Sequence, residues 1–227
     1  MRTASALLCP LLMAAAGALH ASDNLADPYV RVGVAAWYAS PSITIEPDSG
    51  GEVKGSDVGL DEDRVGGMID AYVDVPVPLV PGIHVGLWQW KGEPDEGDDL
   101  VVTGGYAVAM WELELFDRVG VALGAGAIGQ QLDGGDDADA KSTLMPAAAA
   151  RAWVRITDGL TAEVHLFAGG WDEDRGGDAV AQATWRLIGP LAVIGGWRQT
   201  WSTQEGFADA TWKISLGGPF LGAAAVF

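Results

Sequence analysis

The sequence predicts an all-β fold, an antiparallel up-and-down transmembrane β-barrel of about ten strands, and three observations support this class. The chain starts with a secretory signal, and residues 220–227 (FLGAAAVF) form an apolar segment that ends on Phe227. Between them, short segments with period-two alternation are separated in turn by short turns and by mostly longer acidic loops. Short turns at one end and longer polar loops at the other are typical of outer-membrane barrels.

Residues 1–21 have the pattern of a signal peptide. Arg2 supplies an early positive charge, an apolar stretch follows over residues 6–19, and small residues lead to an expected cleavage site after Ala21. The apolar stretch is shorter than the roughly 20 residues that a spanning helix needs. We therefore expect residues 22–227 to form a single outer-membrane β-barrel domain.

The composition excludes several classes of protein. The formal net charge is −18 at pH 7, so a nucleic-acid partner, which needs a basic footprint, is not expected. No window after the signal supplies the run of about 18 apolar residues that a helical membrane protein requires. The single cysteine, Cys9, lies within the signal, so the mature domain has no disulfide framework. A lipoprotein would instead need Cys9 as its first mature residue.

The alternating segments define the expected strands, with both termini at the short-turn end. Their approximate ranges are 29–40, 65–76, 83–92, 99–115, 119–132, 143–156, 160–171, 177–188, 191–202 and 207–227. The short separators are residues 76–82, 116–118, 157–159 and 189–190. The acidic separators are residues 41–64, 93–99, 133–142, 172–178 and 202–206.

Tryptophan and tyrosine residues are expected to form girdles at the two membrane interfaces, near the strand ends. The aromatic residues toward the acidic loops are Trp37, Tyr38, Trp88, Trp90, Trp171, Trp197, Trp201 and Trp212. Those toward the short turns are Tyr29, Tyr72, Trp111, Trp153 and Trp185. The alternative is that they are core aromatics of a soluble sandwich.

Alternation within the strands predicts which side chains face inward. In residues 160–168, Val164 and Leu166 share one face, whereas Glu163 and His165 share the other. A membrane barrel has apolar side chains on its outer surface and polar side chains inside. A soluble barrel or sandwich has the reverse arrangement, and the alternation of the sequence alone does not distinguish these two architectures. The inward charges should pair in a lumen network, because a lone buried charge costs several kcal/mol. The expected network comprises Asp70, Asp74, Glu112, Glu114, Arg151, Arg155, Glu163, His165, Arg186 and Arg198.

The last strand carries a conflict of facing. Thr211 and Lys213 should point inward, whereas Leu221 and Phe227 belong to an outward series on the other parity. One extra residue in the Gly-Gly-Pro segment would reverse the facing, so a β-bulge or kink is predicted there. The expected bulge residues are Gly217, Gly218 and Pro219. Leu221 and Phe227 are then expected to serve barrel assembly and closure against the first strand.

Three segments resemble a known family. They are DVGLDED (residues 57–63), the proline-rich VPVPLVPGIHV (75–85) and the terminal GGPFLGAAAVF (217–227). With these segments the chain is similar to the Gram-negative outer-membrane β-barrel proteins described as having a Gly-Gly motif, whose function is unassigned. The resemblance implies a ten-stranded barrel and no reaction. The chain departs from the family in its higher alanine and glycine content and in Ala225, where terminal strands often place a larger aromatic residue.

The chemistry-bearing residues give little support for catalysis or for a specific metal site. His84 and His165 are both expected to face inward, and Ser215 is the main inward serine, so a lipid-modifying barrel enzyme remains an alternative. The acidic loops do not reproduce calcium-loop spacing, because Asp61 and Asp63 lack the further ligands. We expect no cofactor and no metal, beyond weak association of divalent cations with the acidic loops.

The sequence therefore predicts a protein of the cell outer membrane with a structural or interaction role. A narrow pore or small-solute transporter and a lipid-modifying enzyme are the alternatives, and a soluble periplasmic β-protein is the architectural one. The expected partners are outer-membrane lipid, lipopolysaccharide and, through the C-terminal strand, the barrel-assembly machinery.

Overall fold

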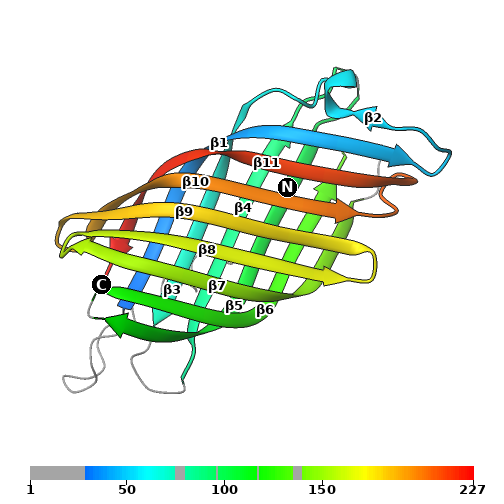
Figure 1. Cartoon of the computed structure of the whole chain (residues 1–227). Helices are drawn as coiled ribbons and strands as arrows, with labels where there is room; N and C mark the ends of the chain where they lie inside the picture. The colour runs from blue at the N-terminus through cyan, green and yellow to red at the C-terminus, as the bar shows by residue number, and fades with distance from the viewer. Residues whose placement is uncertain (1–28, 75–79, 96, 117, 135–139) are drawn as a thin grey trace.

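The computed structural model describes residues 29–74, 80–95, 97–116, 118–134 and 140–227, and in them the chain forms a closed antiparallel β-barrel (Figure 1). The wall has ten strands, each paired with the next along the chain, and the last pairs with the first. The wall strands are β1 (Tyr29–Pro47), β3 (Arg64–Asp74), β4 (Gly82–Gly92), β5 (Leu100–Phe116), β6 (Val119–Asp133), β7 (Lys141–Thr157), β8 (Leu160–Trp171), β9 (Asp174–Ile188), β10 (Leu191–Gln204) and β11 (Ala210–Val226). The predicted barrel is confirmed, whereas the predicted signal peptide lies outside the described residues.

The two ends of the barrel differ in their connections. At the short-turn end, β7 joins β8 through Asp158 and Gly159, and β9 joins β10 through Gly189 and Pro190. At the loop end, β1 and β3 are joined by a longer segment with β2 (Val53–Lys54) and a 3₁₀ turn (Gly55–Asp57). No helix among the described residues is long and apolar enough to cross a membrane.

The predicted alternation of facing is confirmed in the middle of the wall. Leu144, Leu166 and Leu221 are exposed on the outer surface, at 75%, 50% and 67%. Their strand neighbours Met145 and His165 are buried in the interior. The outer surface of this part of the wall is therefore apolar, as a lipid-facing surface requires.

The predicted bulge at Gly217, Gly218 and Pro219 is wrong. The registers of β11 with β10 and with β1 both run through these residues without a shift. Pro219 has no N–H to donate, which accounts for the interrupted pairing opposite Tyr38 and Ala39. A proline therefore interrupts the hydrogen-bond ladder here without adding a residue to the strand.

The conflict of facing has another cause, which is that the polarity of the wall reverses toward the loop end. Lys213 is exposed on the outer surface, and Thr211 shares its parity, whereas Ile214 and Leu216 are buried inside. The inward prediction for Thr211 and Lys213 is therefore wrong. Because the apolar residues face inward here, this part of the barrel has the polarity of a soluble β-barrel.

Polar side chains form a collar on the outer surface of the loop-end part. Lys213 pairs with Glu46 across β11 and β1, with Nζ and Oε1 2.5 Å apart. The Gln199 Nε2 donates to Ser215 Oγ across β10 and β11 at 2.8 Å. Such cross-strand pairs stabilise neighbouring strands on a solvated face.

The aromatic residues divide between the outer surface and the interior. Six of the predicted girdle residues are exposed on the wall. They are Tyr38, Trp111, Trp171, Trp185, Trp197 and Trp201. The girdle prediction is wrong for five others, which are buried inside the barrel. They are Trp37, Tyr72, Trp88, Trp90 and Trp153.

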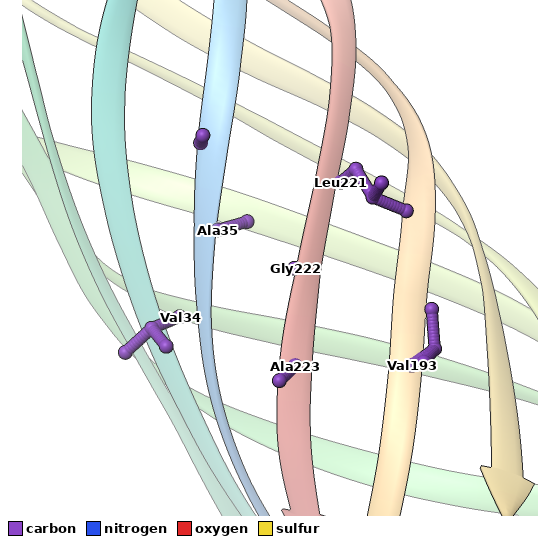
Figure 2. Close-up of a pocket in the computed structure, with 7 residues that line it drawn as sticks. Val34, Ala35, Val193, Leu221, Gly222 and Ala223 are labelled. Atoms are coloured by element: carbon purple, nitrogen blue, oxygen red, sulfur yellow. The ribbon is translucent and has the colours of Figure 1, made fainter.

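The barrel closes between β11 and β1, and the outer side of this seam carries small and branched apolar residues. Figure 2 shows Val34 of β1, Leu221 and Ala223 of β11 and Val193 of β10 around a shallow depression on this seam. At the short-turn end, Phe227 completes the closure through two backbone hydrogen bonds with Val30, at 2.9 and 3.1 Å. The outward facing predicted for Leu221 and the closure against the first strand are confirmed.

The loop-end interior is filled by an apolar cluster. Leu60, from the segment between β1 and β3, is buried against it at 4% exposure. The other members include Trp37, Ile43, Trp88, Trp90, Leu100, Val102, Leu132, Phe207, Ile214 and Leu216. A second cluster, around Tyr106, Met110, Ile128, Met145 and Phe167, fills the side of the interior lined by β5–β8.

Candidate functional site: the polar network of the interior

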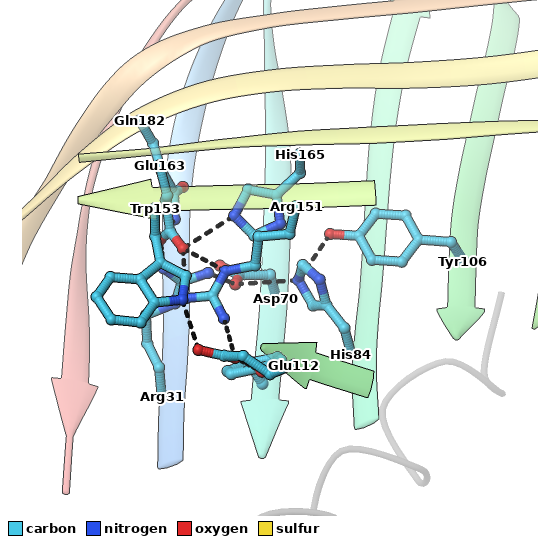
Figure 3. A network of polar contacts seen from close by, with 11 residues as sticks. Arg31, Asp70, His84, Tyr106, Glu112, Arg151, Trp153, Glu163, His165 and Gln182 are labelled. Carbon is cyan, nitrogen blue, oxygen red and sulfur yellow. Dashed lines mark hydrogen bonds and ion pairs between the residues drawn. The ribbon is translucent and has the colours of Figure 1, made fainter. Parts of the chain in front are cut away.

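Five charged side chains from five strands meet inside the barrel (Figure 3). Arg31 of β1 donates to Asp70 of β3 at 2.8 Å and also to Glu163 of β8. Arg151 of β7 donates to the other oxygen of Glu163 at 2.9 Å and to Glu112 of β5 at 3.2 Å. These contacts tie together strands that are far apart around the wall.

Neutral side chains add hydrogen bonds to the Glu112 and Glu163 carboxylates, whereas Asp70 Oδ1 has no hydrogen-bond partner among the described residues. Tyr72 Oη donates to Glu112 at 2.8 Å, and Trp153 Nε1 donates to the same carboxylate at 2.5 Å. Gln182 Nε2 donates to Glu163 at 2.5 Å. With such partners the buried carboxylates keep hydrogen bonds that replace those to water.

Two buried histidines lie beside the charged residues. The His84 ring nitrogen Nε2 is 3.8 Å from the Asp70 carboxylate and 3.1 Å from Tyr106 Oη. His165 Nε2 is 3.0 Å from Glu163, and the two imidazole centroids are 5.0 Å apart. Both rings are buried, so they belong to the network rather than to an open cleft.

A separate buried ion pair lies between the network and the loop-end cluster. Arg198 of β10 donates to Asp178 of β9. The Arg198 guanidinium also lies 5.6 Å from the Trp37 ring centroid and 5.5 Å from that of Trp88. The charge is thus enclosed by one carboxylate and two aromatic rings.

The structure brings together only part of the predicted lumen set. Glu112, Arg151, Glu163 and His165 lie in one network with Asp70. Arg198 pairs elsewhere, Asp74 and Glu114 lie near the short-turn end of the wall, and Arg155 and Arg186 line its mouth. The residues predicted to form one network are therefore divided among three places. The ion cluster lies in the middle of the interior, the ion pair of Arg198 lies toward the loop end, and Arg155 and Arg186 lie at the short-turn opening of the barrel.

Two central residues of the interior, Arg31 and Asp178, are absent from the predicted set. Arg31 has the inward parity of Trp37, but small residues on both faces of residues 33–36 obscure the alternation in this strand. Asp178 falls both in the predicted strand 177–188 and in the acidic separator 172–178, where charge and glycine hide the alternation, whereas β9 already begins at Asp174. Strict alternation carried back from Gln182 would have identified it.

The enzyme alternative loses its candidate serine. Ser215 lies on the outer collar, hydrogen-bonded to Gln199, so the inward prediction for it is wrong. The polar contacts of His84 are with Asp70 and Tyr106, and that of His165 is with Glu163. Across the described ranges, no group of three or more histidine, cysteine and acidic residues is arranged to hold a metal ion.

Comparisons with known proteins identify the fold. The outer membrane protease OmpT of Escherichia coli is similar over 91% of this chain and 100% of its own, with 10% identity and a TM-score of 0.59. The fold is that of an outer-membrane β-barrel. The outer membrane protein AlkL (13% identity, TM-score 0.44, 91% of this chain and 93% of that one) and Neisserial surface protein A (13%, 0.38, 90% and 100%) also match.

The comparisons do not extend from fold to family or activity. No protein-family model and no curated protein sequence matches the chain. At 10% identity, the likeness to a protease carries the fold and no catalytic residue. The resemblance to the Gly-Gly-motif family stays a prediction.

Proposed function

We propose that this chain is a structural or interaction protein of the Gram-negative outer membrane, with a plugged barrel and acidic loops on the outside. The observation that carries the proposal is the buried cluster of Arg31, Asp70, Glu112, Arg151 and Glu163, which joins opposite sides of the wall. The apolar loop-end cluster adds a second barrier behind it. A wide aqueous path belongs to barrels of about 16 or more strands.

The membrane position follows from the outer surface. The apolar middle of the wall, with Leu144, Leu166 and Leu221, would contact acyl chains, whereas the polar collar would lie among lipid headgroups and lipopolysaccharide. The C-terminal strand β11, which pairs with β1, would be the strand that the barrel-assembly machinery recognises. The acidic loops would then face outward, where divalent cations can associate with them.

Membrane fractionation tests this position. We expect the mature chain to appear in the outer-membrane fraction, and to migrate differently on gels before and after heating, because a folded barrel binds less detergent than an unfolded chain. The Lys213→Leu variant removes one charge from the outer collar and leaves the interior unchanged. It should therefore show the same change in migration on heating. Recovery in the soluble periplasmic fraction would contradict the membrane assignment.

Planar bilayer recordings test the plugged interior. Reconstituted protein should show no discrete conductance steps, while a general porin in a parallel chamber reports that the bilayer can detect channels. Reproducible steps that scale with the amount of folded protein would replace the structural role by the narrow-pore alternative. The test is specific, because only an open water path through both buried layers gives current.

The enzyme alternative is not proposed, because no observation favours it. His84 and His165 are each 2% exposed, so a lipid substrate has no access to either ring in this structure. The protease activity in the name of OmpT belongs to that protein. The arrangement instead supports a rigid scaffold in which the interior stabilises the wall.

A further inference from the structure

The short-turn end of the barrel contains a basic basin that the polar network does not use. The basin has a volume of about 330 Å³, at the lower end of the range for small-molecule sites. Arg155 of β7 and Arg186 of β9 line it, together with Thr161 of β8, Thr184 of β9 and Tyr29 of β1. These side chains therefore converge from several strands on one concave surface.

The two arginines of the basin form no ion pair with any carboxylate in the described part of the chain. Most arginines of the described chain form ion pairs, and those that do not are Arg155, Arg175 and Arg186. Two of these three line the same basin. In a chain with 31 acidic and 13 basic residues, most positive charges are expected to be paired, so two exposed guanidinium groups at one site without an ion pair are available to bind an anion.

Among the residues that line the basin, the acidic one is Asp158, and it does not neutralise the two arginines. Asp158 lies in the turn between β7 and β8, and its carboxylate is 3.5 Å from Arg118. Its side chain is 96% exposed, pointing to solvent rather than into the barrel. The lining residues therefore carry two guanidinium groups against one solvent-exposed carboxylate, and the nearby low-dielectric wall strengthens the field of the guanidinium groups.

A second observation points to a ligand with acceptor atoms. Thr184 is 5% exposed, and its hydroxyl has no hydrogen-bond partner among the described residues. Thr184 pairs with Thr161 across β9 and β8, and Thr161 pairs with Arg155 across β8 and β7. The three side chains thus form a row of hydrogen-bond donors along the basin, and Arg186 follows Thr184 on the same face.

We infer that the basin binds an oxyanion of the phosphate class, either free in solution or as part of a lipid headgroup. Two guanidinium groups can each donate two parallel hydrogen bonds to such an anion, and hydroxyl donors complete its shell. Phosphate offers several acceptor oxygens to these converging donors. The basin opens at the short-turn end, so the anion would come from the periplasmic side of the proposed membrane orientation. This inference goes beyond the structural role and does not depend on a plugged lumen.

Calorimetric titration of inorganic phosphate into the purified barrel in maltoside detergent micelles, which contain no phosphate, tests the inference. We expect saturable binding that weakens by about tenfold or more in R155Q/R186Q, because charge-assisted hydrogen bonds are lost. Thr184→Val, which keeps the volume and removes the hydroxyl, should weaken binding about threefold to tenfold. Arg175→Gln is the matched control, since Arg175 is an unpaired arginine of the same strand at its other end, and should bind as the wild type.

The same experiment distinguishes the source of the anion. If phosphatidylglycerol added to the micelles reduces phosphate binding to the wild type, a lipid headgroup occupies the basin; if it does not, the ligand is a free solute. Either result supports the site. No saturable phosphate binding, or equal binding by the wild type and by R155Q/R186Q, would overturn it. Heat-modifiable migration of each variant verifies that the barrel is folded.

Discussion

Replacing Arg31 by methionine should lower the free energy of unfolding by about 3–5 kcal/mol. Arg31 is 1% exposed and is shared by Asp70 and Glu163, so its removal leaves two buried carboxylates short of a positive partner. Methionine retains much of the length and apolar volume of the arginine stem, which limits the cavity that the substitution creates. Urea unfolding in lipid vesicles, followed by tryptophan fluorescence, measures the change.

The control for this experiment is another ion pair of the same wall. Lys213 and Glu46 are paired on the outer collar with side chains 48% and 39% exposed, so Lys213→Met should cost less than about 1 kcal/mol. The double variant Arg31→Met/Asp70→Asn should recover part of the loss, because Asp70 loses its arginine partner when Arg31 is replaced, whereas Glu163 keeps Arg151, and asparagine carries no charge at residue 70. Equal losses for Arg31→Met and Lys213→Met would contradict a stabilising role for the buried cluster.

Replacing Gly218 by alanine should lower the free energy of unfolding by about 3 kcal/mol, the upper part of the range for overpacking. A Cβ at this position would collide with the backbone carbonyl oxygen of Tyr38, across the seam between β11 and β1. Backbone atoms cannot rotate away as a flexible side chain can, so the two strands would have to separate. Urea unfolding reports the loss, and the fraction that migrates as a folded barrel reports closure.

Gly67→Ala is the matched control, because no atom lies within 4 Å of a Cβ built there and Gly67 is also in a wall strand. We expect its stability to stay within about 0.5 kcal/mol of the wild type, as for most surface substitutions. If both alanine variants behave alike, close approach at the seam is not what requires glycine at residue 218.

The fold was predictable because barrel strands leave a strong local signal. Period-two alternation and separator length are read from neighbouring residues, and they gave the strand number, the order and the facing in the middle of the wall. The loop end was not predictable in the same way. Alternation shows that two faces differ, but it does not show which face meets water, so Thr211 and Lys213 were assigned to the wrong side.

The sequence predicts which residues lie in the interior site better than it predicts which of them contact one another. Parity identified Asp70, Arg151 and Glu163 as inward residues, and all of them are buried. The partner of Glu163 across the barrel is Arg31, 132 residues away in the chain, and nothing local specifies that pair. Pairing across an interior depends on strand tilt and on the relative height of distant strands, which separate segments of sequence do not encode.

The reversal of polarity along the wall has a consequence for insertion depth. In the proposed membrane position, sinking the barrel further would bring Lys213 and Glu46 into hydrocarbon, where the cost of an outward lysine rises from about 0–1 kcal/mol near the interface to about 2–4 kcal/mol at the midplane. Raising it would expose Leu144 and Leu221 to water. Both displacements are unfavourable, so in that position the boundary between the apolar wall and the polar collar would fix how deeply the barrel sits in the bilayer, with the collar at the level of the headgroups.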